Sequence, residues 1–458
     1  MSNTPSAAAA TRCMKPAFCL AVGITGHRQA RLAGMANVPI PALRASLRTL
    51  LATIHQSVAT VAVEHAAHFA AVPPTLRLVS ALADGADTLA AEEALAAGWR
   101  LDACLPFLPD EYAGDFADGC DRDSYHALLA RASATFVLPG DRSDAEAAYE
   151  AASKVLLDQV DVLLAVRDGD VGRGRGGTAR VVAEAIARHI PVIHIDVVRA
   201  SAPILFWSGL IDVELEQASI DNVPRAEASI ALAPVIAALC VPPNNPVDHR
   251  MLTRFFKERS RASMPALPYP LLLALVGVRQ FQLSDLRPAS AESCAAPLAE
   301  QLKPVTHSGI YGQALMHKLI MRYGVADAAA AYFAQVFRSG FVANFGLAAI
   351  AVLLALSGPL IAAYKLPLII TELAVIFLIF SNTRAGTRAG WHECWMDDRH
   401  LAEQLRSLAM SSALGNLNLR ANASIDAGAL PGWVHWLARA SWGCRTNQLE
   451  KLLPISSR

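Results

Sequence analysis

VDVLLAVRDGDVGRGRGGTARVV, at residues 160–182, contains a strand-like run, a glycine-rich loop and the start of a helix. Except for Asp161, residues 160–166 are apolar, which is typical of a strand buried on both faces of a parallel sheet. The loop that follows contains Gly172, Gly174, Gly176 and Gly177, and Thr178 opens a helical segment to 188. Glycines let a phosphate approach the backbone, and a helix N-terminus favours negative charge. The stretch predicts an anion-binding loop, with a flexible surface turn as the alternative.

Strand-like and helix-like segments alternate on both sides of this stretch. Strands are expected at 18–24, 76–80, 101–105, 135–138, 162–166 and 191–195, and helices at 41–70, 88–97 and 178–188. Such alternation predicts an α/β fold with a doubly wound parallel sheet. Ligands of such sheets bind at the carboxyl ends of the strands, where the strand order reverses.

Small and polar residues follow three of these strands. The candidate ligand-binding residues are Thr25, Gly26, His27 and Arg28 after the first strand, Ser80, Asp84, Gly85 and Asp87 after the second, and Asp168 with Gly174, Gly176, Gly177 and Thr178 after the fifth. Arg28 and His27 are placed to grip a phosphate, and the three aspartates are candidates for a ribose hydroxyl. Each has a structural alternative, since Asp87 can cap the next helix and His27 can serve packing.

Composition excludes some classes of function. The chain of 458 residues suggests two or three domains. A net charge of zero and a pI near 7.2 provide no basic field, so a nucleic-acid partner is not expected. Eight cysteines show neither a C-x-x-C pair nor a metal-binding spacing, which fits a reducing cytoplasm without a metal site. A hydrophobic content of 53% is high for a soluble protein.

Two long apolar runs contribute to that content. No charged residue lies between Arg338 and Lys365, and Glu372 is the only one between Lys365 and Arg384. Each run is long enough to cross about 30 Å of hydrocarbon as a helix, so spans are predicted at about 341–363 and 366–383. The alternative is a helical hairpin buried in a soluble core. Glu372 is a functional candidate, because an ionisable residue inside a membrane is costly.

The turn around Lys365 is short, so both flanks of a spanning hairpin lie on the same side of the membrane. Arg338, Arg384 and Arg388 flank the base, whereas Lys365 alone marks the tip. Positive residues concentrate on the cytoplasmic side, so the base and both termini are expected in the cytoplasm.

Four motifs give the first half of the chain a resemblance to a known family. They are GITGHR at 23–28, SALADGADTLAAEEAL at 80–95, LPF-x-x-x-EY at 105–112, and DVLLAVRDG with GRGGTARVVAEA at 161–185, which is followed by IPVIHID at 190–196. Residues 16–197 thereby resemble the SLOG superfamily, Rossmann-like domains related to DprA and to the LOG cytokinin-activating enzymes. Members bind nucleotides or nucleotide-derived ligands, which some hydrolyse and others only sense.

The chain departs from the enzymatic pattern of that family. LOG enzymes carry PGGxGTxxE, with a glutamate three residues after the threonine. Counted from Thr178, that position is Val181, and no proline precedes Gly176. The resemblance therefore favours a sensor over an enzyme, with no catalytic residue assigned, no resident cofactor and a nucleotide-derived ligand.

The helical half resembles a second family. Residues 306–412 are similar to SLATT domains, two-helix membrane effectors that accompany SLOG sensors in bacterial nucleotide-signalled conflict systems. The likeness is carried by Trp391, Trp395, Arg399, Ala402, Glu403, Leu405 and Arg406. A last helix carries Trp433, Trp436 and Trp442, which suit either a membrane interface or packing on the bundle.

The expected organisation is a disordered lead at 1–15, a nucleotide-binding domain at 16–200, an extension or connector at 201–305 and a helical membrane domain at 306–458. The resemblances imply a homo-oligomeric effector in the bacterial inner membrane that senses a nucleotide second messenger, permeabilises the lipid bilayer and serves antiviral defence. One alternative is a membrane-tethered hydrolase of nucleotides or N-glycosidic bonds. Another is a membrane scaffold with a degenerate pocket.

Overall fold

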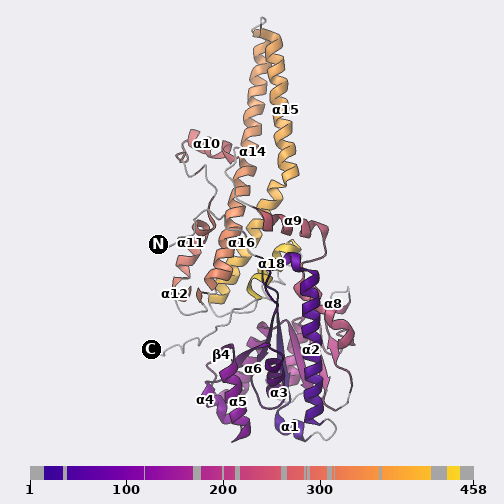
Figure 1. Cartoon of the computed structure of the whole chain (residues 1–458). Coiled ribbons are helices and arrows are strands. Elements are labelled where there is room, and N and C mark those ends of the chain that lie inside the picture. Colours follow the sequence, from indigo (N-terminus) through magenta and orange to yellow (C-terminus); the bar gives the residue numbers. More distant parts are fainter. Residues whose placement is uncertain are drawn as a thin grey trace, which may run out of the picture.

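The computed structural model describes residues 15–34, 39–117, 119–168, 177–198, 201–211, 217–258, 266–282, 285, 289–306, 312–313, 315–360, 364–413 and 431–443. Figure 1 shows a sheet domain at one end, a pair of long helices projecting from the other, and a body of shorter helices between them.

The sheet confirms the predicted doubly wound α/β fold. Its strands are β1 (Cys19–Gly26), β2 (Thr75–Ser80), β3 (Arg100–Leu105), β4 (Ala134–Val137), β5 (Val162–Arg167), β6 (Val192–Asp196), β7 (Ile204–Phe206) and β8 (Arg225–Glu227). Their order is β4-β3-β2-β1-β5-β6-β7-β8, and β1 to β6 are parallel. The chain order reverses between β1 and β5. The short strands β7 and β8 are antiparallel additions at one edge, in a region whose fold was not predicted.

Helices cover both faces of this sheet. One face packs against α2 (Ile40–Glu64), α3 (Ala86–Ala96), α5 (Cys120–Arg131) and α8 (Ala228–Cys240), and the other against α6 (Ala145–Asp158) and α7 (Thr178–Ala187). Short elements at the loops are α1 (Gln29–Ala33), η1 (Ala66–His68), α4 (Pro109–Tyr112), η2 (Ala113–Asp115), η3 (Arg142–Asp144) and η4 (Ser208–Leu210). Every residue of β5 is buried, which explains its continuous apolar run.

The remaining elements form the helical half. They are α9 (Pro246–Lys257), α10 (Pro268–Leu275), α11 (Ala291–Gln301), α12 (Lys303–Thr306), η7 (Met316–Ile320), α14 (Met321–Leu360), α15 (Lys365–Ala389), α16 (Trp391–Ala413) and α18 (Gly432–Gly443). The helix α14 is about 60 Å long at about 1.5 Å per residue. It packs against α11 and α16 in its first part and against α15 beyond them.

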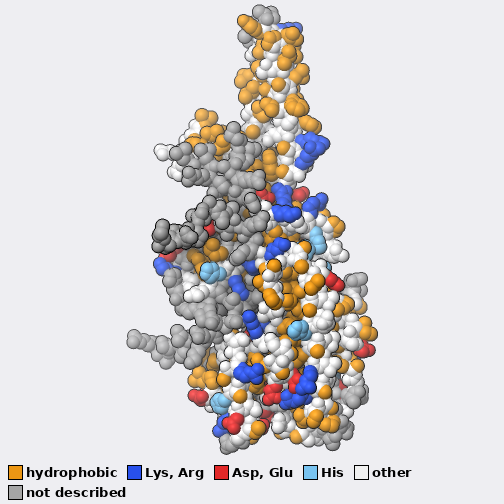
Figure 2. All heavy atoms as spheres, viewed as in Figure 1, with side chains coloured by type: hydrophobic (Ala, Val, Ile, Leu, Met, Phe, Trp, Pro, Cys, Tyr) orange, Lys and Arg blue, Asp and Glu red, His pale blue; other side chains and the backbone are white. Residues whose placement is uncertain are grey.

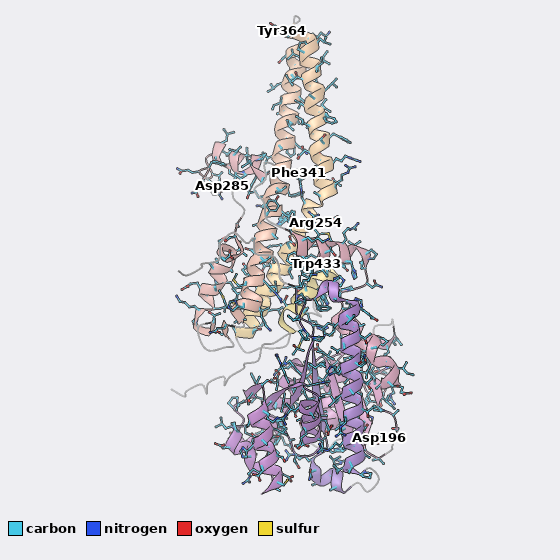
Figure 3. All side chains as sticks on the ribbon, in the orientation of Figure 1. Asp196, Arg254, Asp285, Phe341, Tyr364 and Trp433 are labelled. Carbon is cyan, nitrogen blue, oxygen red and sulfur yellow. The ribbon has the colours of Figure 1, made fainter. Side chains whose placement is uncertain are left out.

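Two helical stretches, Met316–Gly358 and Lys365–Ala413, are long and apolar enough to cross a membrane. Only 11% and 6% of their most apolar windows are buried, unlike core helices of a soluble protein. Apolar side chains cover the projecting part (Figure 2), and Tyr364 lies at its tip beside the exposed Lys365 (Figure 3). The predicted spans lie along these helices, except that 361–363 fall outside the described residues. Glu372 is half-buried on α15.

The helix α18 connects the sheet domain to the helical half. Trp433 and Trp436 are buried, so they pack inside the protein and do not lie at a membrane interface. The Trp433 indole donates to Asp397 of α16 at 3.1 Å, and the Trp436 indole donates to the carbonyl of Cys240, at the end of α8, at 2.7 Å. The Trp442 side chain lies outside the described residues.

Candidate functional site

A cavity of about 390 Å³ opens at the carboxyl ends of β1 and β5, where the strand order reverses. The predicted site residues that line it are Thr25, Gly26, His27, Arg28, Asp87, Asp168, Gly177 and Thr178. Ser80, Asp84 and Gly85 lie beside it, because their hydrogen bonds and close contacts join them to lining residues. Gly174 and Gly176 lie outside the described residues. The structure therefore gathers the described candidates at one edge of the sheet.

Gly26, which lines the cavity, and Gly85, which lies beside it, permit close packing between β1 and α3. Gly85 has φ of +92°, and a Cβ there would lie 2.6 Å from the carbonyl oxygen of His27. A Cβ on Gly26 would lie 2.4 Å from that of Ala86. Both glycines bring the start of α3 against the end of β1, where the Ala86 N–H donates to the His27 carbonyl at 3.1 Å. This packing is a structural role, and a ligand role for the two glycines stays a prediction.

Asp168 joins two of the cavity's basic residues. Its Oδ2 accepts a hydrogen bond from Arg31 Nη2 at 2.5 Å. Nε2 of His27 lies 3.1 Å from both Oδ1 and the backbone nitrogen of Asp168, and the tautomer decides which of these it bonds. Burial lowers the pKa of His27 below its ordinary value, although Asp168 opposes that effect. This shift favours the neutral imidazole, and arginine supplies the permanent positive charge at this side of the cavity.

Arg28 extends over the mouth of the cavity. Its guanidinium lies 5.6 Å from the ring centre of Tyr149, and its nitrogens lie 3.6 Å from Asp84 and 3.9 Å from Asp115. These carboxylates lie beyond ordinary hydrogen-bond length, and 45% of the Arg28 side chain is exposed. Arg28 therefore lines the cavity with part of its guanidinium open to solvent.

Asp87 places a carboxyl group in the wall of the cavity. Its Oδ2 accepts a hydrogen bond from Ser80 Oγ at 3.1 Å, and both side chains are buried. Burial raises the pKa of Asp87 from 3.8 to about 7, because desolvation outweighs the hydrogen bonds that favour the charged form. The group is part protonated near neutral pH and can both donate and accept. The neighbouring Leu82 has a positive φ of 55°, a strained conformation for a non-glycine residue.

The start of α7 faces the same cavity. Gly177 precedes the helix in an extended conformation, and no side-chain hydrogen bond caps the helix. The Thr178 hydroxyl instead donates to the carbonyl of Gly26 at 3.0 Å, which ties α7 to the end of β1. The first N–H groups of a helix have no partner within the helix and suit an anion.

Several lining residues were not among the predicted site residues. They include Arg31, Tyr112, Glu146, Tyr149, Ser153 and Arg167. Tyr112 belongs to the LPF-x-x-x-EY motif, so the sequence did carry a signal for it. Arg31 and Tyr149 reach the cavity from α1 and from α6, and no local motif marks them. Val181, three residues after Thr178, is buried and also lines the cavity.

Together these groups suit a phosphorylated ligand that also carries a sugar or a base. Two arginines and a helix N-terminus can hold phosphate, carboxylates can accept from hydroxyls, and Tyr149 offers a ring face. No model of a known protein family matches the chain, and no curated protein shows significant similarity to it.

Proposed function

We propose that this protein is a two-span effector of the bacterial inner membrane whose cytoplasmic SLOG-like domain senses a nucleotide-derived second messenger. Messenger binding drives homo-oligomeric assembly, and the SLATT-like hairpins then permeabilise the bilayer. Both termini lie in the cytoplasm. The setting that the family resemblance supplies is antiviral defence.

One observation carries the sensing half of this proposal: an open cavity at the switch point of a doubly wound sheet, with arginines and an uncapped helix start around it. Switch points of such sheets are where nucleotides bind. In the proposed complex, the phosphates lie on Arg28 and the Gly177–Thr178 turn, with the preceding loop from Gly174. The ribose lies near Asp84 or Asp168.

The membrane half is supported by the charge distribution on the hairpin. Arg338, Arg384 and Arg388 are exposed at its base, and Lys365 is exposed at its tip. This bias favours a cytoplasmic base. The sheet domain lies on the base side of the hairpin, so it occupies the cytoplasm in the same orientation.

A contiguous route links the cavity to the hairpin base. Asp168 follows β5 at the cavity, and Asp161 precedes β5 at the opposite edge of the sheet. There Asp161 accepts hydrogen bonds from the backbone N–H of Ala21 at 3.0 Å and from Arg439 of α18 at 2.9 Å. The helix α18 in turn contacts α16, which packs along α14. We infer that a shift of β5 on ligand binding is passed to the hairpin through α18.

Ligand binding by the purified full-length protein in detergent tests the sensing half. We expect one member of a panel of NAD⁺, AMP, and cyclic mono- and dinucleotides to raise the melting temperature. Arg28→Ala should weaken its binding about tenfold or more, since a hydrogen bond to a charged group contributes about 1.5–3 kcal/mol. Arg225→Ala is the matched control, because Arg225 also lies over an aromatic ring, Phe206, but on β8 outside the cavity. Equal loss of affinity in both variants would contradict the assigned site.

Asp87 favours a second candidate function, hydrolysis of a nucleotide or N-glycosidic bond. A carboxyl group with a pKa of about 7 in a cavity wall has the property of a general acid or base. Val181 counts against this candidate, because an apolar side chain occupies the place of the LOG-type glutamate. Turnover of the bound probe that disappears in Asp87→Asn would establish the enzyme, and binding without turnover supports the sensor.

A further inference from the structure

The helix α10 and the residues after it present an apolar surface that no described part of the chain covers. From Leu267 to Val278 the sequence LPYPLLLALVGV contains no charged residue. The large apolar side chains exposed on this segment are Leu271, Leu272, Leu275, Val276 and Val278, and Phe281 follows shortly after it. Leu275 is 86% exposed. A monomeric soluble protein rarely leaves so continuous an apolar patch in water.

This surface is held in place against α14 at the base of the hairpin. The backbone N–H of Tyr269 donates to the buried hydroxyl of Ser339 at 3.1 Å. The Gln335 amide donates to the carbonyl of Ala266 at 3.1 Å and to that of Asp285 at 3.4 Å, so one side chain of α14 binds the chain both before and after the segment. Its position beside α14 is therefore fixed by hydrogen bonds at three points.

The height of α10 along the hairpin matches the boundary of the apolar zone. Arg338 is the last charged residue before the uncharged run of α14, and its guanidinium lies 5.6 Å from the ring centre of Tyr269 and 5.4 Å from that of Trp395. Tyrosine, tryptophan and arginine are the residues that gather at membrane–water interfaces. Figure 3 places Asp285 near the level of Phe341, and Figure 1 shows α10 on the tip side of that level. Figure 2 shows apolar side chains at α10.

We propose that α10 is a third membrane element, which inserts into the cytoplasmic leaflet beside the hairpin without crossing the bilayer. An apolar segment of about 10–14 residues suits a core helix or an interfacial segment, and its exposure excludes the core helix. Lipid is the occupant because this face continues the lipid-facing surface of α14. The inference rests on the proposed insertion of the hairpin.

The inserted helix sets the depth of the protein in the bilayer. Gln335 and Ser339 hold α10 against α14. Insertion of α10 into the cytoplasmic leaflet would therefore fix the depth of Arg338 and of the hairpin base relative to the membrane surface. It would also increase the area that each protein molecule occupies in the cytoplasmic leaflet, but not in the outer leaflet.

Site-specific photocrosslinking of the full-length protein in vesicles of phosphatidylethanolamine and phosphatidylglycerol tests this proposal. A photoreactive phenylalanine analogue replaces Leu275 in α10, Leu373 in α15 or Ile230 in α8, which are 86%, 61% and 75% exposed and so tolerate it. Mass spectrometry then identifies the adducts. Lipid adducts are expected at 275 and 373 and none at 230, which lies on the sheet domain.

Lipid adducts at 373 without any at 275 would overturn the assignment of α10 and leave the hairpin standing. Adducts at 275 to a second copy of the chain would likewise overturn it, and would make this face a contact between protomers. Absence of lipid adducts at both positions would overturn the spanning hairpin and α10 insertion together.

Discussion

Asp87 carries a carboxyl group whose ionisation the fold opposes. Its pKa rises from 3.8 in an exposed setting to about 7 in the protein. Between about pH 4 and pH 7 the folded state therefore binds more protons than the unfolded state. The free energy of unfolding then decreases as the pH rises through this window, by up to about 1.4 kcal/mol per pH unit from this group.

Asp87→Asn should remove that part of the pH dependence. The amide has the same shape and stays neutral, so the variant should match the parent at pH 4 and melt at a higher temperature at pH 8. Thermal unfolding of both proteins in detergent from pH 4 to pH 8 measures the difference. A parent that is at least as stable as the variant at pH 8 would show that Asp87 is ionised in the fold at little cost.

The site was predictable residue by residue only where it is built from loops after strands. His27 and Asp168 both follow strands that the apolar runs mark clearly, so their convergence could be expected. Arg31 and Tyr149 come from helices, and which helical residue faces the cavity depends on how that helix packs. Gly85 illustrates a further limit. In the structure its positive φ and its missing side chain allow α3 to pack against the His27 carbonyl. The sequence alone does not tell whether a glycine serves such packing or the close approach of a ligand.

The helix α18 contacts both halves of the molecule. It reaches the sheet through Arg439 and Asp161, and it reaches α16 through Trp433 and Asp397. The ion pair is partly exposed, so it contributes about 1 kcal/mol or less to stability. Its position between the sheet edge and the hairpin base is what gives it a proposed role in coupling.

Arg439→Ala should separate ligand binding from the membrane response. We expect nucleotide affinity and melting temperature close to those of the parent, with ligand-triggered leakage from vesicles reduced severalfold. Arg406→Ala is the matched control, since Arg406 pairs with Glu403 inside α16 and should leave leakage unchanged. Equal leakage in the Arg439 variant and the parent would remove α18 from the coupling route.

Elements with continuous apolar runs were predictable, and short or context-dependent ones were not. Burial on both faces gives β5 an unbroken apolar sequence. The strands β7 and β8 have three residues each, and they form because β6 offers a free sheet edge to which β7 and then β8 can pair. The role of Trp433 was open for a similar reason. An indole suits a membrane interface and a protein core equally, and only its hydrogen bond to Asp397 and its burial assign it to the core.

At the scale of the whole molecule, the cavity and the hairpin lie at opposite ends. The carboxyl edge of the sheet faces away from the hairpin, and α18 lies at the amino edge between them (Figure 1). A ligand in the cavity would therefore lie far from the hairpin, and in our proposal its effect passes through the sheet and α18. The helix α9 also joins the two halves, through the ring contact between His68 and His249 and the hydrogen bond from Arg254 to the carbonyl of Ala389. Two-state coupling of this kind requires the ligand to bind the assembled form more tightly than the resting form.

Leakage from reconstituted vesicles tests the central proposal most directly. The full-length protein is placed in phosphatidylethanolamine and phosphatidylglycerol vesicles loaded with a self-quenching dye, and the nucleotide probe selected by the melting screen is added on the side of the sheet domain. We expect the probe to trigger dye release from vesicles with the parent or with Arg225→Ala, and none with Arg28→Ala. Release that is the same with and without the probe, or that persists in Arg28→Ala, would contradict the account of a nucleotide-gated membrane effector.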